Sequence, residues 1–287
     1  MTQVYFQILN GLVVGSSLAL VASGLALQFG VMDIINFAQG DFYMLGGYAL
    51  WLLLARTNNF ALSLLVGSII VGVLGGALLM LMVRPLLQRA QVMVLLVTLG
   101  LSFVIEQLAN NVFGGSPQLI TPPFGTTVKL GPVTYPVFDL VIVGSAIVVL
   151  AASFLALQYT KYGIWLRGVA QNPSMAAALG VPVTRVFVVA FMVSIGLAAL
   201  AGGLLVPITS VYPTVGGDVI LNAFIIVVAG GLGNFKGAAA IAFLIGEVES
   251  VGSIWVNPAA VQIGLFALVI VILIARTQAT RSTVARI

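Results

Sequence analysis

Two short stretches place polar residues or glycines, which could bind or pass a polar solute, between long apolar runs. The first is Asp33-Ile-Ile-Asn-Phe-Ala-Gln-Gly-Asp41, and the second is Gly-Gly-Leu-Gly-Asn-Phe-Lys-Gly at 230–237. Four glycines weaken a helix by about 1 kcal/mol each relative to alanine. The sequence therefore predicts interrupted segments near 31–41 and 230–237. The candidate pathway or interface residues in them are Asn36, Gln39, Gly40, Asp41, Gly230, Gly231 and Gly233.

Three further acids, Glu106, Glu247 and Glu249, lie within or near the ends of apolar runs. An acid at membrane depth is costly and is a functional candidate by default. The alternative is a hydrogen-bonded acid that locks helices together. The two interpretations are equally weighted for Glu106. A structural role is favoured for Glu247 and Glu249, because residues two apart lie on different faces of a helix.

Several chemistries are excluded by residue types that the chain lacks. There is no Cys and no His, so disulfides, thiolate or imidazole metal sites and a Ser-His-Asp triad are ruled out. There is also no Gly-x-x-x-x-Gly-Lys-Ser/Thr loop that could hold ATP. We therefore expect no enzyme activity, no metal and no cofactor bound by this chain.

The composition determines the fold class. Of 287 residues, 61% are hydrophobic and only 6% are charged, whereas a soluble domain carries about 25% charged residues. We expect an all-α, polytopic integral membrane protein that forms one transmembrane domain over 1–287. It should have about 8–9 transmembrane helices, since a span needs about 20 residues. The expected spans are 5–29, 41–55, 60–83, 92–112, 137–157, 185–206, 219–233, 238–255 and 259–275.

The basic residues predict the orientation. They gather in two loops and the tail: Arg84 and Arg89; Lys161, Arg167 and Arg185; and Arg276, Arg281 and Arg286. The positive-inside rule places all three stretches, and so the C-terminus, in the cytoplasm. Counting spans back from there predicts an outside N-terminus and an outside loop at 114–136. We therefore interpret the net charge of +4 as a sign of orientation in a lipid bilayer and not of nucleic-acid binding.

The two interruptions suggest a pathway. Backbone freed from helical hydrogen bonds at membrane depth is tolerated only against protein or a water-filled cavity. Interruptions at matching positions of two halves usually indicate a translocation pathway built on internal repeats. The sequence itself shows no convincing residue-level repeat. Helical spacing predicts that Asp33, Asn36 and Gly40 share one face.

The loop at about 159–184 predicts a short separate helix. Asn172 can cap its start, Pro173 suits the first helical position, and Gly180 suits the left-handed position after its end. Such a helix is too short to span a membrane. It is either a surface link between spans or a docking element for a cytoplasmic motor, with a smooth surface that includes Ala176 and Ala177.

Several motifs, in the right order, resemble the branched-chain amino acid ABC transporter permeases of the LivH type. Asn36-Phe-Ala-Gln-Gly-Asp41 resembles the family's Asn-Phe-Ala-His-Gly-Glu/Asp motif, and the stretch from Arg167 through Asn172 to Gly180 resembles its cytoplasmic coupling loop. The run from Gly230 to Glu249 resembles its Gly-Gly-Leu/Ile-Gly and Gly-x-x-Glu pattern. The resemblance covers about 5–275.

The resemblance implies a working arrangement. A second, related permease of the LivM type would pair with this chain, and two cytoplasmic ATPases of the LivG and LivF types would bind ATP and Mg beneath it. An extracytoplasmic binding protein would deliver substrate, and the complex would lie in the bacterial inner membrane. Coupling to the ATPases would then fall to Arg167, Asn172, Pro173, Ala176, Ala177 and Gly180.

Two departures from the family pattern stand out. Gln39 replaces the usual His and cannot titrate near neutral pH, and the tail from Ala275 lacks the usual Arg-Pro-x-Gly ending. An ion-coupled secondary transporter of small solutes is the alternative function, because interrupted segments and buried acids suit it too. The sequence does not decide between branched-chain amino acids, other amino acids, amides and urea.

Overall fold

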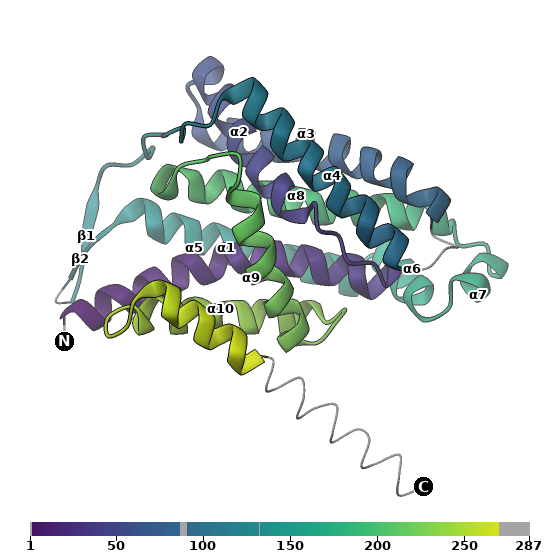
Figure 1. Ribbon diagram of the computed structural model, residues 1–287. Coiled ribbons are helices and arrows are strands. Elements are labelled where there is room, and N and C mark those ends of the chain that lie inside the picture. Colours follow the sequence, from purple (N-terminus) through teal and green to yellow (C-terminus); the bar gives the residue numbers. More distant parts are fainter. Residues whose placement is uncertain (1, 87–90, 132, 270–287) are drawn as a thin grey trace, which may run out of the picture.

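The computed structural model describes residues 2–86, 91–131 and 133–269 and shows a bundle of helices (Figure 1). The helices are α1 (Thr2–Met32), α2 (Gln39–Thr57), α3 (Phe60–Val83), α4 (Gln91–Phe113), α5 (Val137–Tyr159), α6 (Lys161–Gln171), α7 (Pro173–Ala178), α8 (Val183–Thr209), α9 (Val215–Gly230) and α10 (Phe235–Gly252). A 3₁₀ turn, η1 (Arg84–Leu86), follows α3, and Pro258–Val269 is a further short apolar helix. The antiparallel hairpin of β1 (Thr127–Leu130) and β2 (Val133–Pro136) joins α4 to α5.

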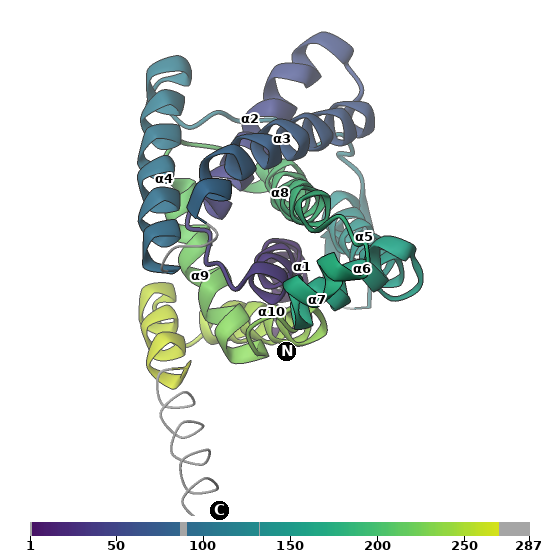
Figure 2. The ribbon, with the colours of Figure 1, turned by 90° about the vertical axis from the view of Figure 1, so that its right-hand side faces the viewer.

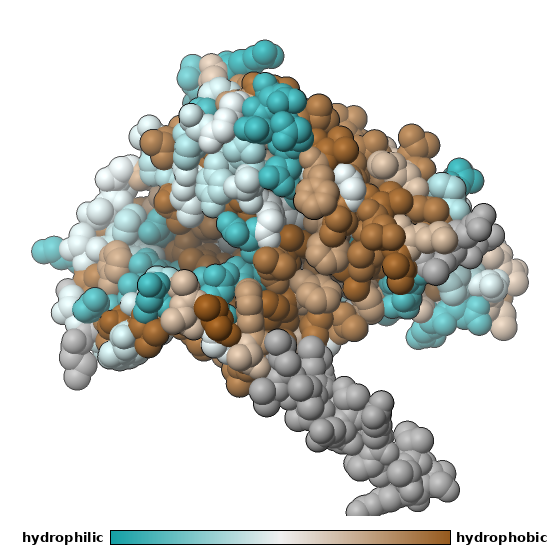
Figure 3. Space-filling model, viewed as in Figure 1, coloured by the Kyte–Doolittle hydropathy of each residue, from teal (hydrophilic) through white to brown (hydrophobic). Residues whose placement is uncertain are grey.

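The all-α membrane fold predicted from composition is confirmed. Five of the described helices are long and apolar enough to cross a membrane: α1, α3 with η1, α4, α5 and α8. The other expected spans correspond to α2, α9, α10 and the helix at 258–269, which are shorter or less apolar; the rest of the span expected at 259–275 lies outside the described residues. The exposed sides of α3, α4 and α5 carry large apolar residues, and Figure 3 shows hydrophilic side chains gathered towards the ends of the molecule.

The basic loops and the N-terminus lie at opposite ends of the bundle. At one end, the Tyr135 hydroxyl in β2 donates to Oδ1 of Asn10 near the start of α1, over 2.9 Å. At the other, Gly233 packs against Gly30 near the end of α1. α3 runs antiparallel to α8, so the end of α3 lies beside the start of α8. η1 directly follows α3, and α6 and α7 directly precede α8, so η1 and the α6–α7 loop lie together at that second end. Arg89 and the three basic residues of the tail lie outside the described residues.

Two long helices, α1 and α8, lie at the centre of the bundle, with α10 along α1 and α3 along α8 (Figure 2). Both pairs pack through small residues. Gly11 meets Glu247 and Gly15 meets Phe243, while Gly76 meets Met192. Small residues four apart let helix backbones approach closely. Here they pack helices of one chain against each other.

The chain contains an inverted structural repeat. α1 is followed by the non-helical segment 33–38 and the shorter α2; α8 is followed by the non-helical segment 210–214 and the shorter α9. Each long helix ends at a non-glycine residue with positive φ, Asp33 at 55° and Ser210 at 75°. α1 starts at the hairpin end and α8 starts at the α7 end, so the two units run in opposite directions.

Candidate functional site

The start of α2 lies inside the bundle, where a buried polar cluster holds it. The Gln39 amide donates to the backbone carbonyl of Ser194 over 3.0 Å and to its hydroxyl over 3.2 Å. Its Oε1 accepts from Gln28 over 3.1 Å and from Asn36 over 3.4 Å. All four side chains are fully buried. Gln39 thus links the segment 33–38 and the start of α2 to α1 and α8 through hydrogen bonds. These hydrogen bonds come from an amide, which does not titrate.

The segment 33–38 is held from its other side by α4. The hydroxyl of Thr98 accepts from the backbone N–H of Phe37 over 3.2 Å and donates within α4 to Leu95 O over 3.0 Å. Because 33–38 is not helical, the expectation that Asp33, Asn36 and Gly40 share a helix face is wrong. Asp33 instead turns outward at positive φ and accepts a hydrogen bond from Gln91.

The first turns of α2 and α9 meet inside the bundle. A β-carbon added at Gly40 would collide with the carbonyl oxygen of Gly216, and one added at Gly216 would lie 2.8 Å from Oδ1 of Asp41. Phe37 and Phe224 stack beside this contact, with ring centroids 6.4 Å apart. The two breaks of the inverted repeat therefore converge on one place.

Asp41 lies at this meeting point. Its side chain is 2% exposed, and its Oδ2 has no hydrogen-bond partner among the described residues. The free N–H groups of two helix starts favour a carboxylate there. Ser102 and the half-buried Glu106, both from α4, lie near the carboxyl group. Of the three glutamates predicted from the sequence, only Glu106 lies near Asp41 and the start of α2.

Glu247 and Glu249 lie elsewhere and, as expected, on different faces of α10. Glu247 presses against Gly11 of α1, and its Oε1 has no partner among the described residues. Glu249 lines a cavity of about 420 Å³ at the hairpin end, together with Asp139 and Asn10. Glu247 thus packs between α10 and α1, Glu249 lies in a separate pocket, and the structural role of both acids stays a prediction.

The glycine-rich stretch 230–237 forms the connection between α9 and α10, so the predicted helix break is present. Gly231 and Gly233 have φ of 96° and 78°, which glycine adopts without steric cost. Gly230 packs on Gly237, and the Asn234 side chain caps α10 by accepting from Gly237 N over 3.1 Å. The stretch lies at the α7 end and does not approach Asp41.

The break that pairs with 33–38 is 210–214, which sequence reasoning missed. The sequence placed it between two expected spans as an ordinary loop. Pro213 and the Gly216-Gly217 pair are the signals that mark it. Its Val211 exchanges two backbone hydrogen bonds with Gln118 in the loop after α4, at 2.8 and 3.0 Å. Gln28, Thr98 and Ser194 were also missed, because single polar residues in apolar helices carry no distinctive pattern.

The short helix in the basic loop forms as predicted. The Asn172 side chain accepts from Met175 N over 2.9 Å, and Pro173 occupies the first position of α7. At its end, Gly180 has φ of 83°, and Val181 N donates to Ala176 O over 3.0 Å. This is a Schellman cap. Both ends of the helix are therefore closed by local hydrogen bonds.

One side of α7 packs on the protein and the rest is exposed. Ala176 is buried, whereas Ala177, Met175 and Leu179 are exposed, the last two by 60% and 78%. The preceding helix, α6, is tied to α5 by Arg167. Its guanidinium donates to the last carbonyls of α5, those of Leu157 and Gln158. Cations suit a helix C-terminus.

Comparison with known proteins agrees with this architecture. A family model described as "Branched-chain amino acid transport system / permease component" matches residues 7–275. No solved structure matches the chain significantly.

Curated relatives cover most of the chain. The high-affinity branched-chain amino acid transport system permease protein LivH of Escherichia coli (strain K12) is 27% identical over 93% of this chain and 92% of its own length. The corresponding BraD protein of Pseudomonas aeruginosa is 28% identical over 94% and 93%. A probable branched-chain amino acid transport permease protein LivH of Methanocaldococcus jannaschii is 29% identical over 85% and 79%. Because the family model spans nearly the whole chain, this protein belongs to the family of branched-chain amino acid transport permease components, multi-pass membrane proteins that act as transporters.

Proposed function

We propose that this chain is the transmembrane permease subunit of an ABC importer for branched-chain amino acids or related small polar solutes. Separate ATPases would energise it, and an extracytoplasmic binding protein would feed it. The observation that carries the proposal is α7. This helix is capped at both ends and exposes Met175 and Leu179 at the end of the bundle where the basic loops lie. Such a rigid, apolar projection suits insertion into a groove on a soluble partner.

The family, and the lack of an ATP-binding loop in the sequence, support a set of partner subunits. They are a second permease of the LivM type, two ATPases of the LivG and LivF types that would hold ATP and Mg, and the binding protein. The complex would lie in the bacterial inner membrane. The basic end with α7 would face the cytoplasm together with the C-terminus, and the hairpin end with the N-terminus would face outward.

In this arrangement α7 would receive the motion of the ATPases through Asn172, Pro173 and Gly180 at its ends, Ala176 on its packed side and Ala177 on its exposed side. Arg167 would pass that motion on through the end of α5. The path would lead to the paired breaks, where Asn36, Gln39, Gly40 and Asp41 lie. Binding of the ATPases to α7 would thereby shift the conformation of the segment 33–38, which is already non-helical.

The test is reconstitution with all subunits. Stable co-purification with two ATPases, and uptake into proteoliposomes that requires both ATP and the binding protein, are the expected results. The alternative, an ion-coupled secondary transporter, is favoured by the interrupted helices and by the buried Asp41. Uptake by the isolated chain driven only by a proton or sodium gradient would establish that alternative and refute the proposal.

A further inference from the structure

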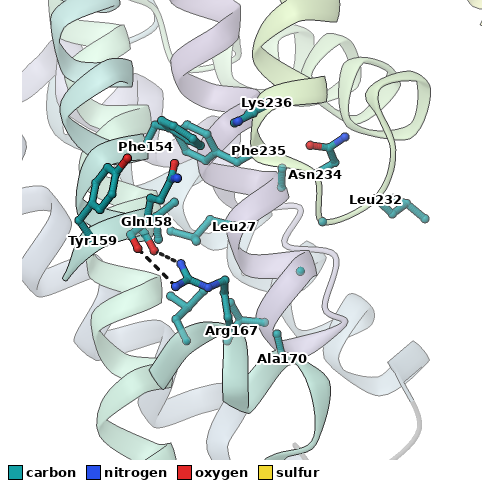
Figure 4. Close-up of a pocket in the computed structure, with 16 residues that line it drawn as sticks. Leu27, Phe154, Gln158, Tyr159, Arg167, Ala170, Leu232, Asn234, Phe235 and Lys236 are labelled. Atoms are coloured by element: carbon teal, nitrogen blue, oxygen red, sulfur yellow. Dashed lines mark hydrogen bonds between the residues drawn. The ribbon is translucent and has the colours of Figure 1, made fainter. Parts of the chain in front are cut away.

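A cavity of about 940 Å³ lies at the α7 end of the bundle, between α1, α5, α6 and the α9–α10 connection (Figure 4). Much of its wall is apolar. Leu27 and Val31 come from α1, Phe154 from α5 and Leu166 from α6, while Phe235 closes it from α10. A pocket with such a wall suits a hydrocarbon-bearing ligand better than a fully hydrated solute.

Two cations from different helices reach this apolar cavity, Arg167 from α6 and Lys236 from α10. In Figure 4 they lie on different sides of it. Lys236 Nζ lies 4.2 Å from the ring centroid of Phe154, a cation–π contact. Arg167 uses part of its fork of five N–H groups on the end of α5 and keeps others free for a ligand.

No carboxylate balances these charges within the cavity. Among the described residues, the side chains that line it include no Asp and no Glu; its other polar members are Gln158, Tyr159 and Asn234. Both cations are exposed, so their N–H donors are accessible to an anionic ligand. The cavity is thus complementary to a ligand with an anionic head and an apolar body.

We infer that this cavity binds an anionic phospholipid, with its phosphate between Arg167 and Lys236 and its apolar part along Leu27 and Phe154. Basic pockets between transmembrane helices on the cytoplasmic side are suited to anionic headgroups. The bound lipid joins α6, which carries α7, to the start of α10. It therefore holds α6 and α7 in place against the bundle.

The inference is tested on the purified full chain in detergent, by native mass spectrometry of retained lipid during titration with phosphatidylglycerol or phosphatidylcholine. Lys236→Gln should weaken phosphatidylglycerol binding about fivefold, since one basic residue contributes about 1 kcal/mol to such binding. Lys236→Arg should restore most of it. The matched control is Lys129→Gln in β1, at the opposite end, which should leave binding unchanged.

Three outcomes would overturn the inference. They are equal binding of the two lipids, equal effects of the Lys236 and Lys129 substitutions, and full displacement of the lipid by inorganic phosphate, which would make free phosphate the ligand. The measurement needs neither ATPases nor transport. Its failure is therefore distinguishable from failure of the importer proposal.

Discussion

Gly40 and Gly216 meet backbone to backbone inside the bundle, at the first turns of α2 and α9. The two glycines follow breaks that interrupt the chain after its two central helices. Their contact joins the two halves of the inverted repeat at one place, beside Asp41. We propose that the two halves move relative to each other at this contact.

The glycine contact can be tested by adding a methyl group. Gly216→Ala should destabilise the protein by about 1–3 kcal/mol, because the new β-carbon would lie 2.8 Å from Asp41 Oδ1 in a packed interior. The measurement is thermal unfolding in detergent, together with uptake in the reconstituted system. Gly217→Ala is the control, since no atom lies within 4 Å of a β-carbon there. Equal melting temperatures for the two variants would contradict the close contact.

The buried amide cluster predicts a large cost for Gln39→Leu. Gln28 and Asn36 would lose their shared acceptor, and each buried polar group left unpaired costs about 1–3 kcal/mol. The unfolding temperature in detergent should fall clearly. Gln107→Leu on the exposed side of α4 removes an amide of the same size and should change little. An undiminished unfolding temperature for Gln39→Leu would show that the cluster does not hold the break.

The C-cap of α7 predicts a coupling defect for Gly180→Val. At φ of 83° a β-branched residue is strained by about 1–2 kcal/mol, although no atom lies within 4 Å of its β-carbon. Membrane insertion should stay normal while the ATP hydrolysis that accompanies transport falls. Gly168→Ala within α6 also meets no neighbour, has no positive φ and should be neutral. Normal coupling in Gly180→Val would remove the mechanical role of α7.

The bridge between Gln118 and Val211 predicts that the loop after α4 and the second break, 210–214, move together. Gln118→Pro removes the N–H that donates to Val211 O over 2.8 Å, at a cost of about 1 kcal/mol. Hydrogen exchange at Val211, whose own N–H donates back to Gln118, should become faster. Gln118→Ala keeps both backbone hydrogen bonds and should behave like the original. Unchanged exchange in the proline variant would mean that the loop does not support the break.

The parts of the fold that depend on local chemistry were predictable from the sequence. Apolar length alone predicted where the long helices lie, because each must cross the lipid and satisfy its own backbone hydrogen bonds. The caps of α7 were equally predictable: Asn172 reaches an N–H three residues on, and Gly180 takes a positive φ that its neighbours cannot adopt cheaply. Neither feature needs a distant partner.

The sequence by itself thus determined a polytopic helical membrane protein with a break near 31–41 and a capped helix in its basic loop. Only the tertiary structure decided that this break pairs with 210–214, and not with the glycine-rich turn at 230–237. The physical reason is that the packing of α1 against α8 sets which breaks meet. That packing depends on small residues, such as Gly24 against Ser194, and on single buried amides. Such residues occur in any apolar helix, so their partners become apparent only once the helices pack together.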